Sequence, residues 1–146
     1  MWLKDEADEE ALARKEQFFE LYGHHLQKVR NKRRQFIICG NWQIAPSAID
    51  VADTESASGQ PGFLGEERQW MDELLANGYV DAFREINSDG DEFTWWPDGD
   101  RDGPGWRTDL QIISEGLRFK VEHGAINKTQ VFSSHAPLIM DYDLEV

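Results

Sequence analysis

A single histidine in a stiff loop is the residue of this sequence best suited to chemistry. His135 lies in the run Ser133-Ser134-His135-Ala136-Pro137, and the apolar run Leu138-Ile139-Met140 follows it. That run is short enough to be a buried strand. Pro137 pushes Ala136 toward an extended backbone and so stiffens the approach to the strand. Such support suits a histidine that has to keep one orientation.

Two upstream loops place further polar side chains beside apolar runs. Gly40-Asn41-Trp42-Gln43 follows an apolar run at 36–39, and Arg107-Thr108-Asp109 precedes another at 110–113. The run at 35–39 is apolar on both faces, which predicts a strand in the middle of a sheet. The loop 40–46 then lies at the carboxyl end of that strand, a usual place for the active sites of α/β proteins.

Five segments in the same order resemble the C-terminal half of the exonuclease III branch of the endonuclease/exonuclease/phosphatase family. They are Gly40-Asn41-Trp42-Gln43, Gly62-Phe63-Leu64-Gly65-Glu66-Glu67-Arg68, Thr94-Trp95-Trp96, Arg107-Thr108-Asp109 and Ser133-Ser134-His135-Ala136-Pro137. The resemblance implies an α/β fold, namely half of a four-layer α/β sandwich. It also implies that residues 1–146 are the C-terminal portion of such a domain, without its N-terminal half. A truncated relative and a fragment are both open.

The family uses a divalent metal held by carboxylates, and three positions depart from its pattern. Asn41 and Gln43 stand where the family has Asp and Asn, and Ser134 stands where it has Asp. An amide cannot carry the charge of a base, and Mg²⁺ prefers anionic oxygen. Asp109 and His135 remain, but one carboxylate is not a metal cage. We therefore predict a vestigial site without catalysis, metal or cofactor, with Mg²⁺ relevant only to a working nuclease.

An inactive branch of the family, the catabolite repression control (Crc) proteins, is similar over about residues 15–146. Lys32-Arg33-Arg34, Phe93-Thr94-Trp95-Trp96-Pro97-Asp98 and Ser134-His135-Ala136-Pro137-Leu138-Ile139-Met140-Asp141-Tyr142-Asp143 carry this similarity. It implies a non-enzymatic regulator that acts with Hfq on A-rich mRNA to repress translation. The alternative is a Mg²⁺-dependent nuclease of the exonuclease III or AP endonuclease type with a degenerate site. A homodimer, or pairing with a separate N-terminal half, is a further possible partnership.

The net charge of −13 opposes binding to nucleic acid unless basic residues gather locally. One such group is Lys28, Arg30, Lys32, Arg33 and Arg34. These cations either complement the C-terminal end of a helix or contact RNA or an acidic partner. Trp95 and Trp96 are either core residues or a surface that stacks on unpaired bases. Arg107 is a third candidate contact.

The remaining pattern predicts helices at 5–34 and 65–77 and strands at 93–96, 110–113, 118–123 and 137–144, the last of which closes the sheet. Residues 47–59 are predicted to be a surface loop in which Asp50 needs no functional explanation. Residues 97–105 form another loop, whose alternating Asp98, Asp100 and Asp102 lack the glutamate of a calcium loop. The sequence has one cysteine, which fits a reducing cytosol. It has no apolar run of membrane-spanning length, and its acidic N-terminus is unlike a signal peptide. These features predict a soluble, cytoplasmic protein.

Overall fold

The computed structural model describes residues 6–145, and the chain divides into two compact units, Met1–Arg34 and Gln35–Val146. The first unit carries one long helix, α1 (Glu6–Arg30). Phe19, Leu26 and Val29 are buried along it at helical spacing. The helix was predicted to reach residue 34, but it ends at Arg30, and Asp5 lies outside the described residues. Lys28 and Arg30 occupy its last turn, where cations complement the helix dipole.

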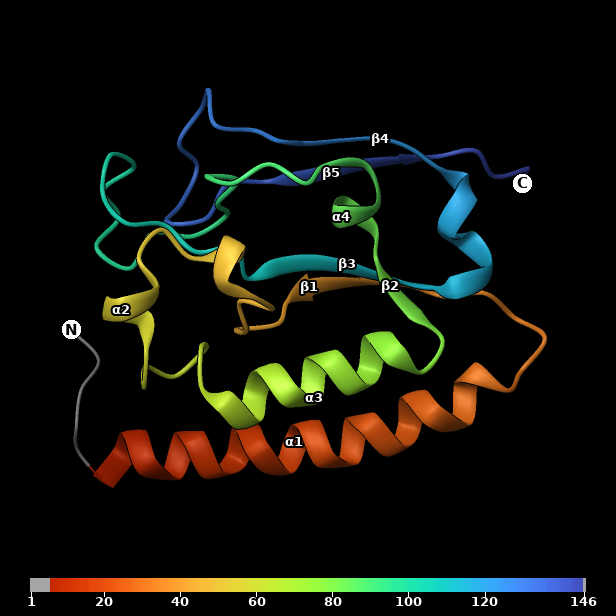
Figure 1. Ribbon diagram of the computed structural model, residues 1–146, viewed down its shortest axis with the longest axis horizontal. Coiled ribbons are helices and arrows are strands. Elements are labelled where there is room, and N and C mark those ends of the chain that lie inside the picture. The colour runs from red at the N-terminus through yellow and green to blue at the C-terminus, as the bar shows by residue number, and fades with distance from the viewer. Residues whose placement is uncertain (1–5, 146) are drawn as a thin grey trace. The chain divides into compact units, whose positions relative to one another are not determined.

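A three-stranded antiparallel sheet forms the centre of the second unit. Its strands are β1 (Ile37–Asn41), β2 (Tyr79–Asp81) and β3 (Asp109–Ser114), in the order β1-β3-β2 (Figure 1). Leu110, Ile112 and Ile113 of β3 are fully buried, as the apolar run predicts. The register places Asn41 opposite Asp109. The two polar loops that the sequence singled out therefore meet at one end of the sheet.

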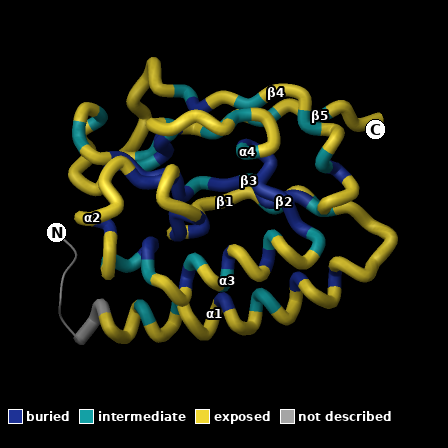
Figure 2. The backbone as a smooth tube through the Cα atoms, in the orientation of Figure 1, coloured by how far each residue is buried: buried dark blue, intermediate teal, exposed yellow. Residues whose placement is uncertain are grey.

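The prediction that residues 35–39 form a central strand is wrong. β1 is an edge strand in the sheet order, and all its residues except Ile38 are exposed (Figure 2). An apolar run predicts a strand, but its composition does not report how many neighbours that strand has.

A second sheet holds only β4 (Val121–Ile126) and β5 (Leu138–Tyr142), paired antiparallel. The last strand was predicted to close the main sheet, and instead it pairs with β4 alone among the described residues. Helix α4 (Ala82–Ile86), which the sequence analysis did not predict, lies between the sheets and contacts β3 and β4 (Figure 1). Its Phe83 is fully buried and packs with Trp96 and Ile126.

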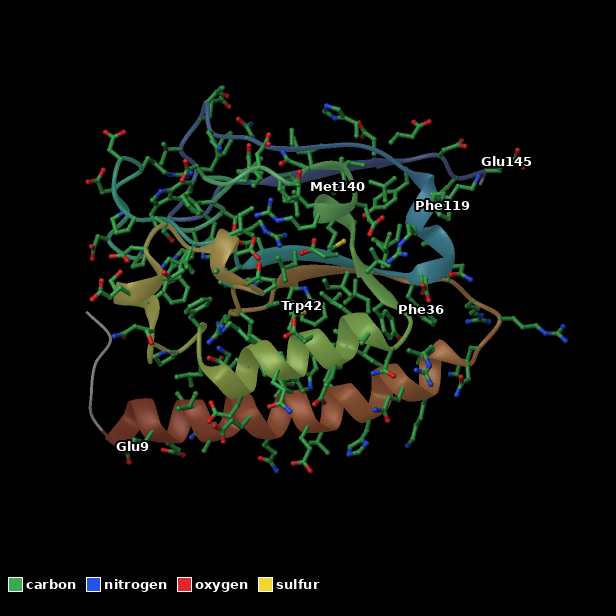
Figure 3. The ribbon with its side chains drawn as sticks, viewed as in Figure 1. Glu9, Phe36, Trp42, Phe119, Met140 and Glu145 are labelled. Carbon is green, nitrogen blue, oxygen red and sulfur yellow. The ribbon has the colours of Figure 1, made fainter. Side chains whose placement is uncertain are left out.

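Two predicted strands are shifted or absent. The segment predicted at 118–123 begins as the 3₁₀ helix η2 (Glu115–Lys120) and becomes β4 only at Val121. Phe119 of η2 projects almost fully into solvent (Figure 3). The segment 93–96 is not a strand, although Trp95 makes isolated bridges to Trp106 and His135. These bridges still connect the tryptophan segment to the histidine loop.

Helix α3 (Gly65–Ala76) was predicted at 65–77 and is confirmed, with Gly78 at a φ of +95° just beyond its end. Trp42 lies between the three-stranded sheet and α3, with its ring centroid 6.2 Å from that of Trp70 (Figure 3). No helix among the described residues combines the length and apolar character needed to cross a bilayer.

Residues 47–59 contain two short helices, η1 (Ala48–Asp50) and α2 (Thr54–Ala57). The segment predicted to be a surface loop is therefore partly helical, and its Asp50 is buried. Ion pairs with Arg84 and Arg107 compensate the charge of Asp50 in this buried position.

Candidate functional site

A hollow of about 280 Å³ opens where the end of β1, the start of β3 and the loop before β5 come together. Its lining includes three of the residues that the sequence analysis selected, namely Asn41, Asp109 and His135. The other lining residues are Cys39, Gly40, Leu110, Gln111, Phe132, Ser133, Ala136, Pro137 and Leu138. Gln43 and Ser134 are exposed and are not among the lining residues.

Asp109 and His135 form a direct hydrogen bond at this hollow. Nδ1 of His135 lies 2.7 Å from Oδ2 of Asp109, and both side chains are partly accessible. A carboxylate accepts, so the ring carries its proton on Nδ1. This contact fixes the ring orientation and leaves Nε2 for a ligand. Nε2 accepts a proton when the ring is neutral and donates a hydrogen bond when the ring is charged.

Asp109 is held from beneath by a buried threonine. Thr94 is fully buried, and its Oγ1 accepts hydrogen bonds from the backbone N–H groups of Thr108 and Asp109, both at 3.0 Å. On the other side, Trp42 N–H donates to the carbonyl of Thr108 at 2.9 Å. The first residue of β3 therefore has little freedom to move its carboxylate.

His135 is held by the same threonine and by an arginine. The N–H of Ala136 donates to the carbonyl of Thr94 at 2.7 Å. One terminal nitrogen of Arg101 donates to the carbonyls of Ser133 and His135, at 3.1 and 3.0 Å. The ring of Trp95 stacks beside the imidazole, with the ring centroids 6.2 Å apart. These contacts restrain the backbone and the ring of the loop that carries His135.

The side chain of Asn41 stabilises a turn in its own loop. Its Oδ1 accepts the backbone N–H of Gln43 at 2.9 Å, and Gln43 adopts a left-handed φ of +54°. The amide NH₂ of Asn41 is the part of the side chain that can donate to an anion in the hollow. An aspartate in this position would make the same turn and would add a negative charge.

The described residues do not fit a magnesium cage of their own. Within residues 6–145, no group of three or more His, Cys, Asp or Glu side chains is arranged to hold a metal ion. Asp109 is hydrogen-bonded to His135, and its cross-strand neighbour is an amide rather than a carboxylate. Mg²⁺ binds best to several anionic oxygens, and these residues supply too few of them to hold it.

Arg107 is not a surface contact, and this corrects its assignment as a partner-binding residue. Its side chain is 1% exposed and donates to both oxygens of Asp81, and also to Oδ1 of Asp50 at 2.6 Å. Arg84 donates to the same Asp50 oxygen at 2.7 Å. The network ties the segment leading into β3 to β2 and η1.

The charges in this network stabilise one another. Burial alone would raise the pKa of Asp50, but Arg107 and Arg84 together hold that pKa below its ordinary value. Burial alone would lower the pKa of Arg107, but Asp81 and Asp50 raise it above its ordinary value. Asp50 and Arg107 are therefore both charged at neutral pH, and their pairing is how such buried ions are tolerated.

The other predicted contacts have mixed outcomes. Trp96 is buried with Phe83 and Phe93, so it belongs to the core, whereas Trp95 is partly exposed. The basic group belongs to the first unit, where Lys28 and Arg30 lie in the last turn of α1 and 32–34 are exposed. Its role in binding a partner stays a prediction.

The segment beginning at Gly62 supports the site without lining it. Gly62 has a φ of +96°, and a Cβ there would lie 3.0 Å from the ring of Trp106. Its carbonyl accepts the N–H of Ala45 at 2.8 Å, and its own N–H donates to the buried Glu67 at 2.7 Å. This segment therefore fixes the end of the loop that carries Asn41.

Four residues that position the site were not predicted to do so: Asp50, Asp81, Thr94 and Arg101. Thr94 lies in the segment Thr94-Trp95-Trp96, and its place beside the tryptophans is the signal that the sequence offers. The others are defined by partners more than 25 residues away, such as Asp81 and Arg107.

Known proteins were compared with this chain by sequence and by structure. No protein-family model matches the chain. An exodeoxyribonuclease of Streptococcus pneumoniae is 30% identical over 128 residues, which are 84% of this chain and 46% of the relative. An exodeoxyribonuclease of Bacillus subtilis is 30% identical over 74% of this chain and 44% of the relative. The chain is therefore similar to exodeoxyribonucleases over most of its own length.

Solved structures agree on the fold. An AP endonuclease from Archaeoglobus fulgidus superposes with a TM-score of 0.80 at 24% identity, over 88% of this chain and 53% of that one. A 3′-5′ exonuclease from Neisseria meningitidis gives 0.80 at 24% identity, over 91% and 55%. The chain therefore has the endonuclease/exonuclease/phosphatase fold, and it spans about half the length of the relatives it matches.

These comparisons correct the expectation that the chain is not an enzyme. The curated relatives are named as exodeoxyribonucleases, which points to an enzyme. Two of the three departures, Asn41 and Ser134, replace an acid by a neutral polar residue, and the Asp109–His135 pair remains. The predicted partnership with Hfq and A-rich mRNA stays a prediction.

Proposed function

We propose that this chain carries part of an exonuclease III-type or AP endonuclease-type site that hydrolyses phosphate ester bonds at DNA ends or abasic sites. The observation that carries the proposal is the 2.7 Å hydrogen bond between Asp109 and His135 at the hollow. The similarity to named DNA nucleases supports the choice of DNA as substrate.

The pair can supply either a hydrogen-bond donor for the phosphate or an acceptor for a proton of the attacking water. Hydrolysis adds the oxygen of water to phosphorus, breaks the bond to the leaving oxygen and requires that oxygen to gain a proton. With Nδ1–H of His135 donating a hydrogen bond to Asp109, Nε2 either donates a hydrogen bond to a phosphate oxygen or takes a proton from water. The NH₂ of Asn41 offers a second donor at the same hollow.

The three departures predict a slow reaction. Asn41 and Ser134 carry no negative charge, so this part of the site has fewer anionic groups than the family pattern. Residues that act as one unit lose activity together when any of them is replaced. We therefore expect turnover well below that of a relative with the full set of acids.

The test uses the full chain with 5′-labelled DNA duplexes that carry a recessed 3′ end, a 3′-phosphate or an abasic site. Each duplex is incubated with and without Mg²⁺, and products are resolved on a denaturing gel. Asp109→Asn and His135→Gln should each lower the rate by about 10²- to 10⁴-fold, the usual contribution of a positioned acid or base.

Asp98→Asn is the matched control, because Asp98 is an exposed carboxylate of the 97–105 loop outside the lining of the hollow. It should leave the rate unchanged. The absence of product from every duplex would refute the proposal, and so would product formation that is insensitive to both Asp109→Asn and His135→Gln.

A further inference from the structure

An exposed aromatic ring at the rim of the hollow has no part in the chemistry described so far. Phe132 is 69% exposed and lines the hollow together with Asp109 and His135. It lies three residues before His135 in the same loop. The adjacent Val131 is 68% exposed, so apolar surface lies at the rim of a hollow lined by Asp109 and His135.

The loop that carries this ring is fixed at both ends. On one side, Arg101 donates to the carbonyls of Ser133 and His135. On the other, Oδ1 of Asn127 accepts hydrogen bonds from the N–H and hydroxyl of Thr129, at 3.1 and 2.8 Å. The N–H of Asn127 donates to the carbonyl of Pro137 at 2.9 Å, which joins the two ends of the loop. The ring is therefore presented from an anchored loop.

The other aromatic rings near the hollow have different surroundings. Trp95 stacks beside the imidazole of His135, and Trp96 is buried under the guanidinium of Arg101. Phe132 is the ring that combines high exposure with a place in the lining.

We propose that Phe132 stacks on an unpaired nucleobase next to the phosphate held at Asp109 and His135. The inference rests on the proposed function and narrows its substrate class. A ring can stack only on a base whose face is open, and every base has such a face once it is unpaired. The site would thus favour frayed, mismatched or single-stranded 3′ ends over fully paired ends.

Stacking also suits the charge of this chain. At −13, the protein repels DNA at long range, and the repulsion is weakened by salt. Contact between a ring and a base does not depend on releasing counterions, whereas contact between cations and phosphates does. The part of the affinity that depends on Phe132 should therefore persist as salt is raised.

The experiment measures binding without turnover. A duplex with a short 3′ overhang carries 2-aminopurine, whose fluorescence is quenched by stacking, at its terminal nucleotide. The full chain is titrated in the presence of EDTA and excited beyond the absorption of tryptophan. The parent should quench the probe, and Phe132→Trp should quench it at least as strongly. Phe132→Ala should remove the quenching and weaken binding by about 5- to 150-fold, the range measured for one stacked base.

Val131→Ala is the matched control, because Val131 is 68% exposed and adjacent but has no ring. It should change neither quenching nor affinity. The inference is overturned if Phe132→Ala binds and quenches like the parent, or if a probe in a fully paired 3′ end is quenched equally. Either result leaves hydrolysis dependent on Asp109 and His135 untouched, whereas loss of that hydrolysis in the parent would refute the proposed function itself.

Discussion

The side chain of Thr94 accepts the backbone N–H of Asp109 at 3.0 Å, from a position 15 residues earlier in the chain. The same hydroxyl accepts the N–H of Thr108, and the carbonyl of Thr94 accepts the N–H of Ala136. One fully buried residue thus holds both members of the Asp109–His135 pair through the backbone. The hydrogen bond of the pair depends on a residue that touches neither ring nor carboxylate.

Thr94→Val should destabilise the protein, because valine has nearly the same shape but leaves two buried N–H groups without an acceptor. Each such group costs about 1–3 kcal/mol. Urea unfolding followed by circular dichroism would measure the loss. Thr94→Ser retains the hydroxyl and should recover most of it. Equal stability of the valine and serine variants would show that the hydroxyl has no such role.

The elements near the site were predictable because they are local. Apolar runs beside turn residues identified β1, β3 and β5. Asn41 ends β1, Asp109 begins β3 and His135 lies just before β5, so the three residues are located once these strands are known. The exposure of β1 was not predictable, because Ile37 and Ile38 form the same pattern in an edge strand as in a central one.

The buried network was not predictable because its members are far apart in sequence. Asp50 looks like an ordinary loop residue until Arg107, 57 residues later, is placed beside it. Likewise, Arg107 resembles a surface cation in a polar loop. Only the tertiary structure reveals that the two residues neutralise each other.

Stability should fall in acid because of Asp50. The pKa of this buried carboxyl is lowered in the folded protein, so it binds a proton less readily than in the unfolded chain. Its contribution is therefore present above the unfolded value, near pH 4, and is lost as pH falls through the lower folded value. Thermal unfolding between neutral pH and pH 2 should show this loss.

Asp50→Asn should remove that part of the pH dependence and destabilise the protein at neutral pH. Leaving a buried charge wholly unpaired costs about 3–5 kcal/mol, and the cost here should be smaller because Arg107 keeps its ion pair with Asp81. Asp98→Asn, at an exposed position, should leave both the stability and its acid dependence unchanged. An unchanged acid transition in the Asp50→Asn protein would contradict this account.

Restoring the acids of the family pattern should create a cation site. Asn41→Asp places a carboxylate directly across the strand pair from Asp109, and Ser134→Asp adds another beside His135. With Gln43→Asn, these changes should give measurable Mn²⁺ binding by calorimetry and faster DNA cleavage. Hard divalent ions favour several anionic oxygens.

A charge-matched control distinguishes a site from a general increase in negative charge. Ala52→Asp and Ser58→Asp add the same two charges at exposed positions outside the lining of the hollow. This variant should bind Mn²⁺ no better than the parent. Equal binding by both variants would mean that the geometry at Asn41 and Asp109 does not select the ion.

The chain should self-associate through the edge of β1. Ile37 on this edge strand is 37% exposed, and an open strand edge offers unpaired N–H and C=O groups to another chain. Sedimentation velocity at tens of micromolar should therefore show species larger than the 16.9 kDa monomer. Ile37→Lys should shift the distribution toward monomer, because a charged side chain on an edge opposes strand pairing.

Ile49→Lys is the matched control. It changes an isoleucine of similar exposure, 40%, that lies in η1 rather than on the strand, and it should leave association unchanged. A parent that sediments as a monomer, or equal effects of the two lysines, would rule out association through this edge.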